Sequence, residues 1–164
     1  MRILGIDPGS RFTGAGLIEL NGDRLRLLHY EVIKAGTGDF PERLGIIFNG
    51  VKDLVSDWRP DQAAVESVFV AHNPSSAIKL GQARGAAICA IINGGVSVAE
   101  YTPRAIKQAI VGTGSADKTQ VQHMVRMLLS LTETPPEDAA DALAVALCHH
   151  HTSGTLEKMA ILRQ

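Results

Sequence analysis

The fold is decided by residues 2–34, which read RILGIDPGSRFTGAGLIELNGDRLRLLHYEVIK. Residues 2–7 predict a short buried strand ended by a Pro-Gly turn, and residues 13–20 predict a second strand. The Asn-Gly pair at 21–22 favours a tight hairpin, because both central residues of a type I′ turn need a positive φ. Residues 24–34 predict a third strand. The chain therefore opens with a three-stranded antiparallel meander.

The rest of the chain alternates helices with two further strands. Helical spacing of apolar residues, together with capping signals, predicts helices at 39–59, 74–92, 103–111, 117–131 and 136–151, and short apolar runs predict strands at 62–67 and 96–101. This order indicates an α/β fold, with a five-stranded mixed sheet (three antiparallel strands, then two parallel) and helices on both faces. We expect one domain over residues 1–151 and a loose tail at 152–164.

Composition narrows the functional class. The 164 residues (17.5 kDa) fit one domain of ordinary size, and 45% of them are hydrophobic and 20% charged. No apolar run approaches the roughly 20 residues of a membrane span, and Asp7 interrupts any leader peptide, so we expect a cytoplasmic protein without a membrane partner. Cys89 and Cys148 lack the paired spacing of a zinc site and are expected to be buried free thiols.

Charge is distributed unevenly along the chain. The net charge of −1 argues against a general nucleic-acid binder. Residues 67–132, however, carry six basic and two acidic side chains, a balance of +4. The pattern gives mild support to a cationic surface beside an acidic site.

Four carboxylates stand where packing alone would favour apolar residues. Asp7 and Glu66 each end a predicted buried strand, and Asp138 and Asp141 lie three residues apart on one face of an Ala- and Leu-rich helix. Each has an ordinary alternative, such as a turn residue for Asp7, a surface acid for Glu66 or a helix N-terminal charge for Asp138. Because four such coincidences would be needed, we expect the four acids to converge.

Converging carboxylates need a counter-charge, because they cannot all ionise side by side. Mg²⁺ takes oxygen ligands and leaves room for water and phosphate, whereas no Cys or His set indicates zinc. Two such ions about 3.5–4 Å apart would activate a water and stabilise the leaving oxygen of a phosphodiester. Lys107 and Lys118, in the basic part of the chain, are candidates to balance the phosphate charge.

Six motifs are longer and more specific than an isolated Gly-rich loop: GIDPGSRFTG (5–14), ESVF (66–69), LGQARG (80–85), IKQAIVGTGSADK (106–118), QVQHMVR (120–126) and DAADALA (138–144). Over about residues 2–150, the chain resembles the RuvC family of bacterial Holliday junction resolvases. The resemblance implies a ribonuclease H-like fold and a symmetric homodimer. Such a dimer binds four-way DNA junctions and, with Mg²⁺ (Mn²⁺ as a substitute), nicks two strands of like polarity in recombination and repair.

The resemblance also implies a set of partners and site residues. The partners are the junction, a second copy of the chain and a branch-migration motor of the RuvA and RuvB type. The acidic tetrad, which holds the metal, maps onto Asp7, Glu66, Asp138 and Asp141, and the active-site lysines map onto Lys107 and Lys118. We predict DNA contacts at Phe69, Asn73, Arg104, Lys107 and Lys118, with Phe69 as the aromatic residue that contacts the junction. We predict a dimer contact at Leu80, Gln82, Ala83 and Gly85.

Other functional readings stay open at this point. An actin-like ATPase also begins with a Gly-Ile-Asp strand, but a second phosphate loop and a second lobe are missing. A catalytically silent junction-binding protein is a second alternative, although such a protein would gain nothing from four acids facing phosphates. A related nuclease acting on RNA is a third, and it would be distinguished by a protein contact to the 2′-hydroxyl of the RNA. We expect residues His149–His151 to form the solvated last turn of the final helix, with a soft-metal site as the alternative.

Overall fold

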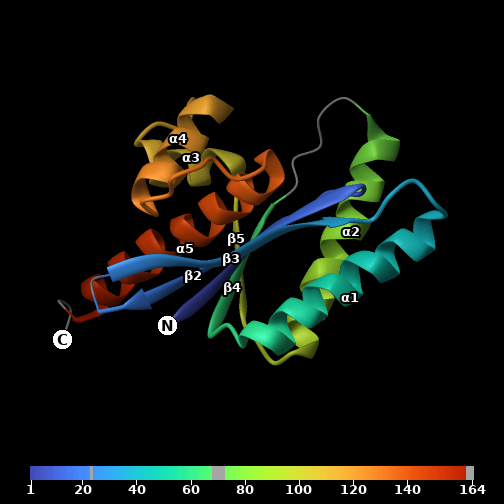
Figure 1. The fold of residues 1–164 in the computed structure, drawn as a ribbon, viewed down its shortest axis with the longest axis horizontal. Helices are drawn as coiled ribbons and strands as arrows, with labels where there is room; N and C mark the ends of the chain where they lie inside the picture. Colours follow the sequence, from blue (N-terminus) through green and yellow to red (C-terminus); the bar gives the residue numbers. More distant parts are fainter. Residues whose placement is uncertain (23, 68–72, 162–164) are drawn as a thin grey trace.

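The computed structural model describes residues 1–22, 24–67 and 73–161, and its centre is a five-stranded sheet in the order β3-β2-β1-β4-β5 (Figure 1). The strands are β1 (Arg2–Asp7), β2 (Phe12–Asn21), β3 (Arg24–Lys34), β4 (Gln62–Glu66) and β5 (Val98–Tyr101). β1, β2 and β3 pair antiparallel, whereas β4 runs parallel to β1 and β5 runs parallel to β4. The mixed sheet predicted from the sequence is therefore confirmed.

Helices cover both faces of this sheet (Figure 1). The helices are α1 (Phe40–Trp58), α2 (Pro74–Asn93), α3 (Pro103–Val111), α4 (Lys118–Leu128) and α5 (Glu137–Ile161). α1 and α2 pack together on one face, and α5 crosses the other face with α3 and α4 against it. Alternate residues of each strand supply the two cores, as a pleated strand requires.

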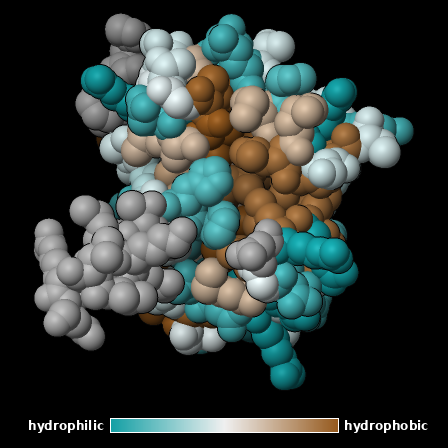
Figure 2. Space-filling model, turned by 90° about the vertical axis from the view of Figure 1, so that its left-hand side faces the viewer, coloured by the Kyte–Doolittle hydropathy of each residue, from teal (hydrophilic) through white to brown (hydrophobic). Residues whose placement is uncertain are grey.

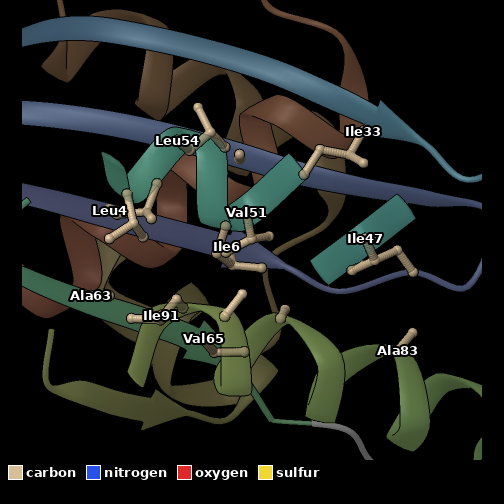
Figure 3. Packing of buried hydrophobic residues seen from close by; sticks show 14 of the residues in the cluster. Leu4, Ile6, Ile33, Ile47, Val51, Leu54, Ala63, Val65, Ala83 and Ile91 are labelled. Atoms are coloured by element: carbon tan, nitrogen blue, oxygen red, sulfur yellow. The ribbon is translucent and has the colours of Figure 1, made fainter. Parts of the chain in front are cut away.

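Figure 3 shows the core between the sheet and the α1–α2 layer. Leu4 and Ile6 of β1 and Val65 of β4 contact Val51 of α1 and Ile91 of α2 in one buried cluster. The intervening strand residues, among them Ile3 and Ala64, belong instead to the core beneath α5. Successive side chains of a strand point to opposite faces of the sheet, so this alternation also fixes the face of the last residue of each strand. Asp7 and Glu66 are therefore on the α5 face.

Glycines let α5 lie unusually close to the sheet. A Cβ added to Gly5 of β1 would overlap the backbone of Ala142 and Ala146, and one added to Gly14 of β2 would overlap the backbone of Asp138. Gly residues at these positions therefore permit backbone-to-backbone approach. The consequence is that the N-terminal turns of α5 sit directly over the carboxyl end of β1.

The last helix is longer than expected. It was predicted to end near His151, but the backbone stays helical to Ile161. No proline follows position 136, and the hydroxyls of Thr152 and Ser153 donate to the carbonyls of Cys148 and His149, which fits a continuing helix. The division into a domain and a separate tail stays a prediction.

The surface beside this helix is mixed in character. Figure 2 looks onto the side that carries the β2–β3 turn and the C-terminal half of α5, and it shows a hydrophobic area bordered by hydrophilic residues. Leu20, Leu25 and Leu27 of the hairpin are only partly buried against the core beneath α5. Within the described residues, no helix is long and apolar enough to span a membrane.

Candidate active site

Asp7 and Glu66 form the centre of the site. The parallel register pairs Ile6 with Val65, so Asp7 and Glu66 follow side by side at the carboxyl ends of β1 and β4. Their side chains share a hydrogen bond, which requires a proton on one of them. Burial, followed by the hydrogen bond and the charge of Glu66, raises the pKa of Asp7 from 3.8 to about 9. Burial also raises the pKa of Glu66.

α5 brings two more carboxylates to this pair. Asp141 lines the same cleft as Asp7 and Glu66, and burial raises its pKa although Lys118 opposes the shift. Asp138 lies one turn earlier, close enough for its charge to raise the pKa of both Asp7 and Asp141. The four predicted acids are therefore brought together, with Asp138 at the edge of the cluster.

Two lysines complete the cleft, which has a volume of about 320 Å³. The Lys118 ammonium pairs with the Glu137 carboxylate and lies 3.6 Å from Asp141. The hydrogen bond that Lys118 donates to Glu137 raises the pKa of Lys118, so this cation stays charged. Lys107 of α3 also lines the cleft and acts on Glu66 by its charge. Sequence reasoning did not predict the pairing of Glu137 with Lys118, because the two residues are 19 positions apart in the chain.

The turn after Asp7 is fixed by two buried polar residues. The Thr13 hydroxyl donates to the Gly9 carbonyl at 2.9 Å and accepts from the Gly9 N–H at 3.3 Å. The Arg43 guanidinium of α1 donates to the carbonyl of Ser10 and lies over the Phe40 ring. These contacts hold the loop between β1 and β2, and they are a second feature that the sequence did not reveal.

The donor set suits a hard divalent cation. Its members are carboxylate oxygens around an open cleft. Burial first, and then the charges of neighbouring carboxylates, raise the pKa of Asp7, Glu66 and Asp141. Within the described part of the chain, no three acidic, His or Cys side chains are close enough to form a finished metal site. Instead, Asp7 and Glu66 share a proton and Lys118 pairs with Asp141. The chemistry of the residues therefore fits a cation.

A family model, described as crossover junction endodeoxyribonuclease RuvC, matches residues 3–149. The chain belongs to the RuvC family. Crossover junction endodeoxyribonuclease RuvC of Acinetobacter baylyi is 59% identical over 160 residues, which cover 98% of this chain and 88% of that relative.

Solved RuvC structures support the same assignment. The Thermus thermophilus RuvC structure matches with a TM-score of 0.87 and 39% identity, covering 94% of this chain and 96% of the other. A structure of T. thermophilus RuvC in complex with a Holliday junction substrate has a TM-score of 0.87 and 40% identity, with 93% and 94% covered. The ribonuclease H-like fold expected from the resemblance is confirmed.

The other DNA contacts predicted for this RuvC chain lie apart from the acid cluster. Asn73 caps α2 and accepts from the backbone N–H groups of Ser75 and Ser76, at 3.0 and 3.3 Å. Arg104 lines a separate depression with Thr113, beyond the cleft. Phe69 lies outside the described residues. The structure therefore joins Lys107 and Lys118 to the acids, but not Asn73 or Arg104.

One residue of the predicted dimer contact is misplaced. Ala83 is fully buried in the core between α2 and the sheet (Figure 3), so it cannot touch a partner. Helical spacing puts Ala83, Ala87 and Ala90 on the inward side of α2. Leu80 and Gly85 are partly exposed and Gln82 is exposed. Cys89, expected to be buried, is also exposed on this helix.

His149 is not the solvated residue that the sequence suggested. It is buried, with Nδ1 2.9 Å from the Tyr101 hydroxyl and Nε2 2.9 Å from the Gln62 side-chain oxygen. Burial lowers the pKa of His149, so the ring is neutral and one nitrogen donates while the other accepts. These bonds tie α5 to β4 and β5, the strands beside the acid cluster.

Proposed function

We propose that this chain is a Holliday junction resolvase that nicks two strands of like polarity during recombination and repair. The observation that carries the proposal is the cleft in which Asp7, Glu66 and Asp141 meet Lys107 and Lys118. The family match over residues 3–149 supports the same activity. We expect the protein to act in the cytoplasm, with a branch-migration motor of the RuvA and RuvB type as its partner.

Mg²⁺ is the proposed cofactor, held by Asp7, Glu66, Asp138 and Asp141. Oxygen-only donors favour Mg²⁺, with Mn²⁺ as a substitute, over the softer metals that prefer His and Cys. When bound, such ions supply a Lewis acid and a nucleophilic water for phosphodiester hydrolysis, with two ions for each cleft as the proposed number.

The chain's own residues orient the substrate and balance its charge. Lys107 and Lys118 flank the acids and are placed to neutralise charge that develops on the phosphate. Glu137 keeps Lys118 charged and directed along α5. The turn held by Thr13 and Arg43 fixes the backbone after Asp7, so the carboxylate is preorganised.

A homodimer is proposed through the outward face of α2. Ile78 and Ile92 are 62% and 60% exposed there, although both are large and apolar. Between them, an added Cβ at Gly81 or Gly85 would meet no atom of another described segment within 4 Å, so packing among the described residues does not require glycine there. A second helix approaching closely would explain both features, and a two-fold dimer matches the two-fold symmetry of a four-way junction.

A synthetic four-way junction tests the proposed function. We expect paired, symmetric nicks when Mg²⁺ is present, none with EDTA, and none in a linear duplex of the same sequence. Binding without nicks would favour a silent junction-binding protein. Cutting of an RNA-containing duplex in preference to the junction would favour a ribonuclease. Either result would overturn the proposal.

A further inference from the structure

A groove of about 420 Å³ lies on the other side of Asp138 from the catalytic cleft. It is formed where β2 and β3 pass the N-terminal end of α5. Its lining residues are Phe12, Tyr30, Glu31, Val32, Lys34, Pro136 and Asp138. None of them except Asp138 has a part in the proposed chemistry.

Two aromatic rings are exposed in this groove. Phe12 is 48% exposed and Tyr30 is 38% exposed. Phe12 pairs with Lys34 and Tyr30 pairs with Gly16 across the β2–β3 ladder, so the side chains of Phe12, Tyr30 and Lys34 share the α5 face of the sheet. Neither ring is buried in the core, so core packing does not account for an aromatic residue at either position. Both rings present a flat face that a ligand could stack on.

Besides its two aromatic rings, the groove is lined by one basic residue, Lys34, and by two acidic residues, Glu31 and Asp138. Lys34 is exposed at one end. Glu31 borders the groove, but its carboxylate is directed toward the α1 face, where it lies 3.2 Å from Nε2 of His29. The His29 ring stacks there on Trp58 of α1, with ring centroids 5.1 Å apart. Asp138 lines the groove and also acts by its charge on Asp7 and Asp141, so the groove adjoins the acid cluster.

We propose that this groove holds one or two nucleobases of the DNA strand that enters the catalytic cleft, stacked on Phe12 and Tyr30 next to the scissile phosphate. The inference rests on the proposed function, because it needs a DNA strand in the cleft. Stacking on an aromatic side chain is worth about 1–3 kcal/mol for each base and tolerates every base type. The groove would thus help to hold the strand on the side of the acids away from Lys107.

Photocrosslinking tests the location directly. The wild-type protein is bound to a junction without divalent metal, and 5-iodouracil replaces single thymines on both sides of the cut position. Irradiation should join one or two of these positions to Phe12 or Tyr30, identified by mass spectrometry of the peptides. Crosslinks confined to other segments, or to none, would overturn the proposal.

Variants give an independent measure. Phe12→Ala and Tyr30→Ala should each lower the single-turnover efficiency of junction cutting about 5- to 150-fold, the equivalent of one lost stacked base. Phe12→Trp should restore it, whereas Phe12→Leu should not, because only the indole stacks. Ile46→Ala is the matched control: Ile46 is also exposed, at 45%, but lies on α1 across the sheet, and its loss should leave cutting unchanged.

The two proposals fail differently. If the wild type cuts junctions and both alanine variants cut equally well, the groove proposal is wrong and the resolvase proposal stands. If Phe12→Leu cuts junctions as efficiently as the wild type, any apolar side chain suffices at position 12, and base stacking is excluded. If the wild type neither binds nor cuts junctions, the proposed function is wrong, and this inference with it.

Discussion

At the residue scale, the raised pKa of Asp7 means that folding disfavours the ionised form of its carboxyl group. Because its pKa rises from 3.8 to about 9, the carboxyl is protonated in the folded protein at neutral pH and ionised in the unfolded chain. Folding therefore takes up a proton. The stability linked to this group is fully present below about pH 4 and falls as the pH rises toward 9.

Asp7→Asn should remove this pH-dependent loss, since an amide cannot ionise and can still donate to Glu66. In EDTA, we expect the variant to exceed the wild type in free energy of unfolding at pH 8 by at least about 1.4 kcal/mol, the equivalent of one pKa unit. The difference should shrink toward pH 4. Urea unfolding at both pH values measures it, and equal stability at pH 8 would contradict the raised pKa.

Lys107→Ala should slow cutting more than it weakens binding. A group that balances developing charge contributes mainly in the transition state, so we expect a loss of about 100-fold in the single-turnover rate. Junction affinity should fall only a few-fold. Rates at saturating protein and titrations without metal separate the two effects. Equal losses in both would make Lys107 a simple phosphate anchor.

The sequence revealed acids that interrupt apolar segments, but it did not reveal which side chains form hydrogen bonds with each other in the fold. Asp7, Glu66 and Asp141 stood out because acids interrupted apolar runs at the ends of strands and within a helix. The Lys118–Glu137 pair spans 19 positions and the His149–Gln62 bond spans 87, so neither has a local signal. His149 was expected in solvent because three consecutive histidines resemble a polar helix end.

At the element scale, the site depends on how closely α5 lies on the sheet. Gly5 and Gly14 allow the backbone of α5 to contact β1 and β2, and this contact places Asp138 and Asp141 over Asp7. The strands and helices themselves followed from periodicity and turn residues. The close approach did not, because a glycine in a strand also fits a bulge or a bend. The end of α5 was missed for lack of a helix-breaking residue.

Gly14→Ala should displace α5 and so damage both stability and activity. The new methyl group would overlap the Asp138 backbone, and overpacking of this kind costs about 1–3 kcal/mol. Gly45→Ala is the control: it lies in α1 with open space around it, and the better helix former should stabilise the protein by up to about 1 kcal/mol. Thermal unfolding and cutting rates test the pair. A harmless Gly14→Ala would mean that α5 is not held this closely.

At the scale of the whole molecule, the two faces of the sheet have different tasks. α3, α4 and α5 build the cleft on one face, while α1 and α2 cover the other and leave the apolar outer side of α2 exposed. The layered architecture followed from the order of strands and helices. The residues of the dimer contact could not be assigned one by one from the sequence, as Ala83 shows, because the motif at 80–85 covers both the inward and the outward side of α2.

Gly85→Gln should weaken the dimer without harming the fold of the chain. Among the described residues, and apart from the helix's own backbone, nothing lies within 4 Å of an added Cβ at Gly85, so the fold leaves room for a longer side chain there. Sedimentation should show the wild type near twice 17.5 kDa and the variant shifted toward the monomer. Gly45→Gln on α1 should sediment like the wild type. A wild type that stays monomeric would exclude the proposed interface.

The most direct test of the central claim compares wild type and Asp7→Asn on one synthetic junction, with binding measured without divalent metal and cutting measured with Mg²⁺. We predict that the variant binds within a few-fold of the wild type and cuts at least about 1,000-fold more slowly, a barrier increase of about 4 kcal/mol. Comparable cutting by the variant would show that the acid cluster is not the catalytic centre. Loss of binding together with cutting would show that Asp7 is structural.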